Sequence, residues 1–292
     1  MSDAPLLVLG CGYVGTRLAL AARAAGRTVR VCARGTGRLA HLAQQGIEVK
    51  YLDVSIPKQL TAAVSGLHGG TVVYSIPPAT SGPPGAAVRA AMQAAYGVGA
   101  NAFIYFSSSG MYGPLPDDEV WIDEDSDVTH DDPPMQGVQT DELVITQSQF
   151  DRLRTVVLRL APVYGPRRGV RERLRKGEYK LLDDGAHAIS RIHVDDVVKV
   201  VFAAEDRAET GALLLVADDE PTTQRDYATW LCERMNVKMP ASRSLYEPGA
   251  RQVAHRNRKI RNTRLKETLG LTLTYPTFRE GEVAIEEELA RE

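Results

Sequence analysis

The sequence is poor in cysteine and aromatic residues, and it contains no long hydrophobic run. Of its 292 residues, 6% are aromatic and three are cysteines: Cys11, Cys32 and Cys232. Three distant cysteines without a CxxC pair argue against a disulfide framework or a zinc site, so we expect reduced thiols and no metal. The apolar start at 5–9 is soon broken by glycines and arginines, unlike a signal sequence or membrane span. We therefore expect a cytoplasmic protein without a membrane partner.

An excess of charge of either sign is also missing. Lys and Arg number 35 against 37 Asp and Glu, which gives a net charge of −2. Without a basic field the chain is not drawn to nucleic acid, so we expect no such partner. Hydrophobic residues at 43% and charged residues at 25% are typical of a folded globular protein. The length suits two domains, or one large domain with an added lobe.

Short apolar runs alternate with Ala-rich stretches of helical periodicity up to residue 160. Strands are expected at 5–9, 28–32, 47–52, 71–74, 102–106 and 155–160. Helices are expected near 14–25, 36–45, 57–65, 84–98 and 136–152. This alternation predicts an α/β fold with a Rossmann-type doubly wound parallel sheet.

The rhythm changes after residue 165. The patterns there predict a helix near 194–206, a strand at 212–216, and helices near 223–236 and 276–290, while 114–134 and 241–258 read as loops. We therefore expect a dinucleotide-binding domain at 1–165 and a small substrate domain at 166–292. Part of 190–217 is expected to return to the first domain.

A glycine motif follows the first expected strand. Its residues are Gly10, Cys11, Gly12, Tyr13, Val14 and Gly15. The GxGxxG spacing between a strand and a helix is typical of dinucleotide binding. The three glycines permit a tight turn, a close approach of backbone to pyrophosphate, and close helix packing, while the helix N-terminus supplies free N–H donors.

The residues after the second and third expected strands bear on the choice of cofactor. Where an Asp or Glu would bind the ribose of NAD, the chain has Arg34, with Arg38 one turn later. Guanidinium groups suit a 2′-phosphate, so NADP is expected first and NAD second, unless both arginines are solvated surface residues. Asp53, followed by Val54, is placed either to accept from the adenine amino group or to cap a helix.

Four further blocks carry a family resemblance. They are YFSSSGMYG at 105–113, LRLAPVYGP at 158–166, SRIHVDDV at 190–197, and 265–281 with its YP and EG pairs. Together with the glycine motif, they resemble the extended and atypical short-chain dehydrogenases/reductases, the NAD-dependent epimerase/dehydratase group. The resemblance spans nearly the whole chain.

The resemblance implies a substrate cleft above the carboxyl ends of the strands, where a small molecule would bind. It implies that Ser108 is the active-site serine that polarises a substrate carbonyl or hydroxyl. By the same resemblance, cofactor-lining positions are Ser75, Ile76 and Pro77 on the ribose and phosphate side, and Pro162 and Val163 near the nicotinamide. Homodimers are common in the resembled group, which leaves a homodimer open here.

The acid/base pair of the resembled group is missing. In that group YxxxK places a phenol and an ammonium on one helical face, where the cation lowers the phenol pKa. Here these positions fall on or near Gln136 and Thr140, and there is neither Tyr nor Lys between Gly113 and Arg152. Three explanations stay open: binding without chemistry, a proton from another group, or a reaction that needs only positioning and hydride transfer.

Tyr112 and His193 are the remaining catalytic candidates, and each also suits a structural role. Tyr112 lies close to the expected cleft, and buried tyrosines usually pack. Histidine ordinarily titrates near neutral pH, and two acids follow His193, yet the same stretch suits a helix cap. Basic residues in the stretches 167–173 and 251–266 suggest an anionic substrate or a solvated face.

Three functions therefore compete. The first is an NAD(P)-dependent oxidoreductase acting on a small polar, anionic or sugar-derived carbonyl or hydroxyl compound. The second is a catalytically silent NADP-binding redox sensor or scaffold. The third is a nucleotide-sugar epimerase or dehydratase with tightly held NAD. An ionisable residue from another segment beside Ser108 would favour the first.

Overall fold

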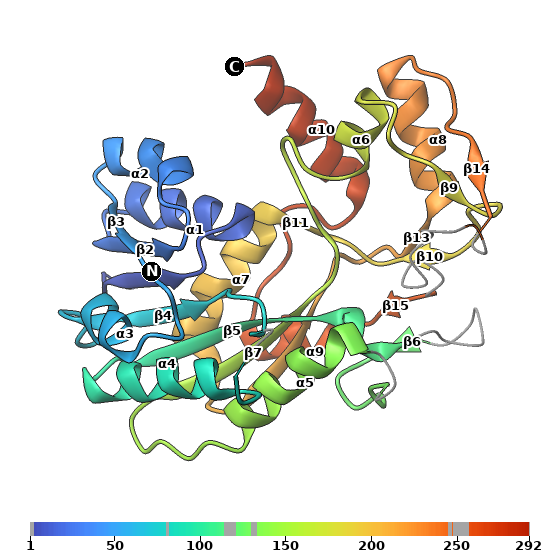
Figure 1. Cartoon of the computed structure of the whole chain (residues 1–292). Coiled ribbons are helices and arrows are strands. Elements are labelled where there is room, and N and C mark those ends of the chain that lie inside the picture. Colours follow the sequence, from blue (N-terminus) through green and yellow to red (C-terminus); the bar gives the residue numbers. More distant parts are fainter. Residues whose placement is uncertain are drawn as a thin grey trace.

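The computed structural model describes residues 3–79, 82–113, 121–129, 133–244, 247 and 257–291. Within these ranges a central parallel sheet has seven strands in the order β12-β7-β5-β4-β1-β2-β3 (Figure 1). The strands are β1 Leu6–Leu9, β2 Val29–Ala33, β3 Glu48–Tyr51, β4 Thr71–Tyr74, β5 Ala102–Ser108, β7 Arg154–Leu160 and β12 Ala212–Val216. The predicted Rossmann-type doubly wound sheet is confirmed.

Helices cover both faces of this sheet because alternate strand residues point to opposite sides. Leu6 and Val8 enter one core, and Leu7 and Leu9 enter the other. The first core is closed by α1 Tyr13–Ala24, α2 Ala40–Gln44, α7 Val194–Arg207 and α9 Thr263–Leu269. The second is closed by α3 Pro57–Val64, α4 Ala86–Gly97 and α5 Pro133–Thr146.

A smaller lobe lies beyond the carboxyl ends of the strands (Figure 1). Its helices are α6 Val170–Arg175, α8 Gln224–Met235 and α10 Phe278–Ala290. Tyr164, Tyr227, Leu231, Phe278 and Ile285 form its buried core. Among the described residues, four two-stranded pairs lie outside the central sheet: β8 Val163–Tyr164 with β11 Ile192–His193, β10 Ala188–Ile189 with β13 Thr222–Thr223, β9 Leu181–Leu182 with β14 Ser242–Arg243, and β6 Trp121–Ile122 with β15 Lys259–Ile260.

The chain crosses between the sheet and the lobe more than once. β12 pairs in parallel with β7, and α7 packs on α1, so the stretch from 194 to 216 completes the sheet layer. The helix α9 packs on α7 and β12 and was not expected from the sequence, because its seven residues are too few for a clear apolar period. The sheet layer is thus built from both halves of the chain.

Three other expectations need correction. The helix expected at 36–45 starts with a 3-10 turn at Gly37–Leu39. The helix expected at 136–152 is α5, which starts on Pro133 because proline is tolerated in a first turn, and ends at Thr146. The two expected loops contain the short strands β6 and β14, while 114–120, 130–132, 245–246 and 248–256 lie outside the described residues.

In the described part of the chain, no helix has both the length and the hydrophobicity needed to cross a membrane.

The same ranges contain no group of three or more His, Cys, Asp or Glu side chains arranged to hold a metal ion. The cysteines Cys11, Cys32 and Cys232 are free and buried.

Candidate functional site

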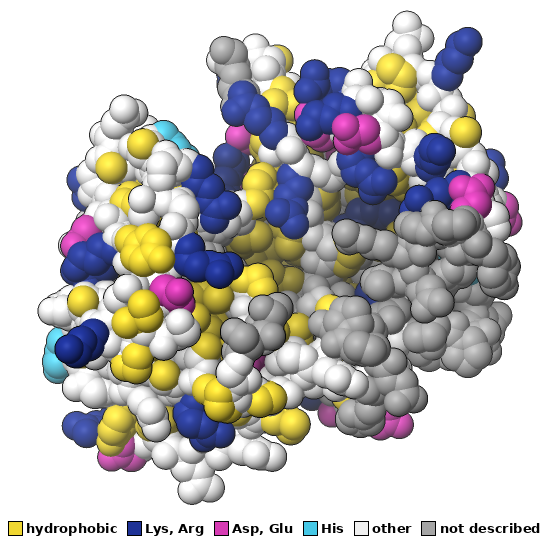
Figure 2. Space-filling model, viewed as in Figure 1, with side chains coloured by type: hydrophobic (Ala, Val, Ile, Leu, Met, Phe, Trp, Pro, Cys, Tyr) yellow, Lys and Arg dark blue, Asp and Glu magenta, His cyan; other side chains and the backbone are white. Residues whose placement is uncertain are grey.

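The carboxyl ends of the central strands face a hollow between the sheet and the smaller lobe. Figure 2 shows this hollow with apolar side chains in its depth and Lys and Arg side chains on both of its sides. Open parallel sheets bind ligands at this edge, where the strand order reverses. The reversal lies between β1 and β4, beside the glycine motif.

The three motif glycines meet three different physical requirements. Gly10 has a φ of +89°, and a Cβ there would lie 2.7 Å from the carbonyl carbon of Ser75. A Cβ on Gly15 would lie 3.0 Å from the Val8 side chain. No described atom lies within 4 Å of the Cβ position of Gly12, the N-cap of α1. Backbone next to open space at a helix N-terminus fits the pyrophosphate of a dinucleotide.

Other predicted cofactor residues surround this turn. Cys11 is buried, and burial raises the pKa of its thiol, so it packs as a small apolar residue. Ser75 donates its N–H to the Leu9 carbonyl at 2.8 Å, which holds Ser75 and Ile76 against Gly10. Pro77 next to them is exposed.

Two arginines follow β2 near the same turn. The Nη2 atom of Arg38 donates to the Cys11 carbonyl at 3.4 Å. Arg34 is exposed, and its charge contributes to the lowered pKa of Asp53, after the larger effect of hydrogen bonds from Ser55. Both arginines therefore belong to the glycine-turn end of the sheet, as the NADP prediction requires.

The carboxylate of Asp53 has a local task. It accepts from the N–H of Ser55 at 3.0 Å and from the Ser55 hydroxyl at 2.7 Å. These bonds stabilise the turn that includes Val54 and precedes α3. Asp53 is not the cap of α3, because the N-cap is Ile56 and it has no side-chain cap bond, and contact of Asp53 with adenine stays a prediction.

Ser108 ends β5 and begins a short turn over Ser109–Tyr112. Its Oγ accepts the Gly110 N–H at 3.0 Å, and its side chain is half-buried. A Cβ on Gly110 would lie 2.9 Å from Ser108 Oγ and 2.7 Å from the sulfur of Met135. The side chain of α5 that meets this turn is therefore Met135.

The positions expected for the missing acid/base pair, on or near Gln136 and Thr140, stay a prediction. Within α5, Met135 places its sulfur at the Ser108 turn. Gln139 donates its amide to the Thr129 carbonyl at 2.6 Å, whereas the hydroxyl of Thr140 bonds back to Gln136 at 2.9 Å. A thioether and an amide cannot serve as a general acid.

Tyr112 belongs to a buried ionic cluster. Its hydroxyl accepts from Arg159 at 2.5 Å, and Arg159 pairs with Glu142 of α5 at 2.8 Å. Burial raises the pKa of Tyr112, and its side chain is 1% exposed. These contacts describe a structural side chain, and no observation here supports a catalytic one.

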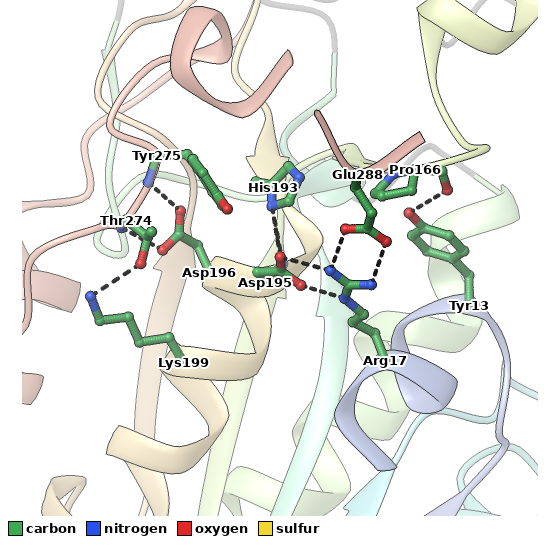
Figure 3. Close-up of polar contacts among 10 residues, drawn as sticks. All are labelled: Tyr13, Arg17, Pro166, His193, Asp195, Asp196, Lys199, Thr274, Tyr275 and Glu288. Atoms are coloured by element: carbon green, nitrogen blue, oxygen red, sulfur yellow. Dashed lines mark hydrogen bonds and ion pairs between the residues drawn. The ribbon is translucent and has the colours of Figure 1, made fainter. Parts of the chain in front are cut away.

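His193 caps α7 (Figure 3). Its Nδ1 accepts the N–H of Asp195 at 3.2 Å, and its ring packs edge-on against Tyr164 and Tyr275. Burial lowers its pKa to about 4, so the ring is neutral at physiological pH. The adjacent Asp196 accepts the N–H groups of Thr274 and Tyr275 at 2.7 and 2.9 Å. The stretch joins segments of the fold, which gives His193 a structural role.

Sequence reasoning did not single out Arg258. This residue is buried, and its Nη2 donates to the Gly110 carbonyl at 3.4 Å, two residues after Ser108. It was visible only as one member of a basic stretch, and 251–256 of that stretch lies outside the described residues. A guanidinium does not release a proton at physiological pH, but it stabilises negative charge.

Comparison with known proteins places this arrangement in context. The family model for the NAD-dependent epimerase/dehydratase family matches residues 6–214. A curated protein from Streptomyces sp., a 3-diazoavenalumate denitrifying reductase, is 27% identical over 311 residues, covering 94% of this chain and 98% of that protein.

Similar solved structures cover nearly the whole chain. A conserved protein of unknown function from Silicibacter pomeroyi is 27% identical with a TM-score of 0.83, and covers 98% of this chain and 99% of its own. A UDP-glucuronic acid 4-epimerase from Bacillus cereus, solved with NAD, is 15% identical with a TM-score of 0.78 at the same coverage. The second likeness concerns the fold alone.

Proposed function

The chain belongs to the NAD-dependent epimerase/dehydratase family, and from this premise we propose that it is an NADP-dependent reductase that transfers hydride without a tyrosine acid. The observation that carries the proposal is the α5 face beside Ser108. That face presents the thioether of Met135, and α5 contains neither a Tyr nor a Lys for proton transfer.

The bound cofactor supplies the hydride, and the chain's own residues position the acceptor. Gly12 leaves room for the pyrophosphate at the start of α1. Ser108 offers a hydroxyl to the substrate, and the Arg258 guanidinium stabilises negative charge near the same turn. None of these groups needs to give up a proton, so the substrate must be electrophilic enough to accept hydride without a strong acid.

The name of the Streptomyces relative agrees with such chemistry. It describes a denitrifying reductase of a diazo compound. When hydride attacks the carbon of an aryl diazonium cation, a C–H bond forms, the C–N bond breaks and N2 leaves, so the step needs no proton. We propose an acceptor of this kind, activated and carrying an anionic group. Nucleotide-sugar epimerisation is less well supported, because it requires proton removal from a sugar hydroxyl, and the α5 side chain at the Ser108 turn is Met135, which is not a base.

The preference for NADP rests on charge. Arg34 and Arg38 follow β2 at the place where an acidic residue would favour NAD. The Bacillus cereus epimerase contains NAD, which supports a dinucleotide but not the choice between the two. The 2′-phosphate is the feature that Arg34 would recognise.

Calorimetric titration with NADPH, NADP+, NADH and NAD+ tests the cofactor. Wild type should bind the NADP forms tighter, and Arg34→Ala should weaken them about tenfold while leaving NADH and NAD+ nearly unchanged. Arg175→Gln, an exposed arginine of α6, serves as the charge-matched control. Absence of any dinucleotide binding by wild type would refute the proposal.

A screen for NADPH oxidation then tests the chemistry. Activated acceptors such as aryl diazonium carboxylates should be reduced, whereas unactivated ketones should not. Because Met135 and Arg258, which contact the Ser108 turn, do not release protons in this range, the single-turnover rate should vary less than about threefold between pH 6 and 9. Tight binding with no turnover on any acceptor would favour the silent redox sensor instead.

A further inference from the structure

A rigid turn of the smaller lobe reaches the glycine motif. The N–H of Gly165 donates to the Arg168 carbonyl at 3.1 Å, and the N–H of Arg168 returns a bond to Gly165 at 3.0 Å. Arg167 between them has a φ of +59°. The paired bonds fix the direction in which the Arg168 side chain leaves the turn.

Tyr13 holds this turn in place. Its hydroxyl donates to the Pro166 carbonyl at 3.0 Å (Figure 3), and the Arg168 guanidinium lies over its ring at 5.0 Å from the centroid. A Cβ on Gly165 would lie 2.5 Å from the Tyr13 hydroxyl and 2.7 Å from Val194, so the two segments are in close contact. The face of the Tyr13 ring therefore stabilises the Arg168 cation.

Tyr13 is also the first residue of α1, directly after Gly12. The Arg168 cation thus contacts a side chain of the first turn of α1, the turn whose N–H groups point into the open space at Gly12. In the described ranges, Arg168 has no carboxylate partner. Its neighbours have other contacts: Arg171 pairs with Glu282 and Glu286, and Arg173 lies over Tyr179.

We propose that Arg168 binds the pyrophosphate of the dinucleotide and so connects the smaller lobe to the cofactor. The inference rests on the proposed dinucleotide site. Arg168 approaches from the lobe side of the glycine turn, and Arg38 approaches from the β2 side through its bond to Cys11. Arg34 recognises the 2′-phosphate, whereas Arg168 recognises a group that NAD and NADP share.

The experiment compares ligands that contain different parts of the cofactor. Affinities of NADP+, NAD+, ADP-ribose and adenosine 2′-monophosphate are measured calorimetrically for wild type, Arg168→Gln, Arg168→Lys and Arg34→Ala. Arg168→Gln should weaken NADP+, NAD+ and ADP-ribose by a similar factor of about ten, and leave adenosine 2′-monophosphate unchanged. Arg34→Ala should weaken only the two ligands with a 2′-phosphate.

The remaining measurements distinguish a wrong assignment of Arg168 from a wrong proposed function. Arg168→Lys should bind more tightly than Arg168→Gln but less tightly than wild type, because lysine keeps the positive charge but lacks the planar guanidinium group. Equal affinities of wild type and Arg168→Gln for all four ligands, or a loss confined to the 2′-phosphate ligands, would overturn the assignment of Arg168. No binding of any dinucleotide to wild type would instead overturn the proposed function. Unchanged melting temperatures of the Arg168 variants are required for the comparison, and Arg175→Gln is the control.

Discussion

His193 lies between the rings of Tyr164 and Tyr275, with its Nδ1 bonded to the N–H of Asp195. Its residue type suggests proton transfer, but burial favours the neutral ring and lowers its pKa to about 4. Tyr112 is similar, since burial and the Arg159 bond involve its hydroxyl in packing. At the scale of single residues, the surroundings decide which titratable groups are available for chemistry.

The lowered pKa of His193 predicts a loss of stability in acid. Unfolded histidine binds a proton below about pH 6.5, whereas native His193 does so only near pH 4, so the unfolded state gains protons first as the pH falls between these values. His193→Asn keeps a capping acceptor without this titration. The stability advantage of wild type over the variant should shrink by about 2 kcal/mol from pH 7.5 to pH 4.5 in urea titrations. An advantage that stays constant with pH would contradict this.

At the scale of elements, the turn between β1 and α1 contains one glycine that the fold requires and another that ligand binding would require. Gly10 needs its φ of +89° and its contact with Ser75, whereas Gly12 faces open space. Glycine is thus required at position 10 by the backbone conformation and, on our proposal, at position 12 by the close approach of the ligand.

Two alanine variants test this division. Gly10→Ala should lower the free energy of unfolding by about 2 kcal/mol or more, because its Cβ would collide with the Ser75 backbone. Gly12→Ala should change stability by less than about 1 kcal/mol but weaken NADP+ binding at least about tenfold. Denaturation curves and calorimetry on both variants supply the comparison. A Gly12→Ala protein with wild-type affinity would argue against a pyrophosphate at this turn.

A buried ion pair joins the β1–β2 connection to α7. The guanidinium of Arg27 pairs with Glu205 at 2.7 Å, and both side chains are almost completely buried. Arg27→Met should cost about 3–5 kcal/mol, since it leaves the Glu205 charge buried and unpaired. The double variant Arg27→Met with Glu205→Leu should recover most of that loss, as measured by chemical denaturation. Equal losses in the single and double variants would show that packing matters more than charge.

At the scale of the whole molecule, contacts between distant segments hold the sheet layer and the lobe together. Arg17 of α1 pairs with Asp195 of α7 at 2.6 Å and with Glu288 of α10 at 2.7 Å (Figure 3). All three side chains are about one-third exposed, so solvent weakens each pair. Within the sheet layer, apolar packing contributes more, because α7 and α9 help to close one face of the sheet and β12 extends its edge.

A fragment of residues 1–165 tests whether the first half of the chain folds without the second half. The fragment lacks α7, α9 and β12, which leaves β7 as an open edge and leaves one core covered only by α1 and α2. It should show no cooperative thermal transition by circular dichroism, whereas the full chain should unfold cooperatively. A sharp transition of the fragment would show that the first half closes its own core.

The sheet class and the position of the glycine turn follow from the amino-acid sequence. Alternating apolar runs and helical periods are local signals, as is the spacing of Gly10, Gly12 and Gly15, so they can be recognised without a fold. The absence of Tyr and Lys from α5 is equally plain. The folded chain was needed to show that Met135 meets the Ser108 turn, and that Arg258 and Arg168 reach Gly110 and Tyr13. Those contacts join residues far apart in the chain, and their geometry depends on how the lobe packs against the sheet rather than on any local pattern.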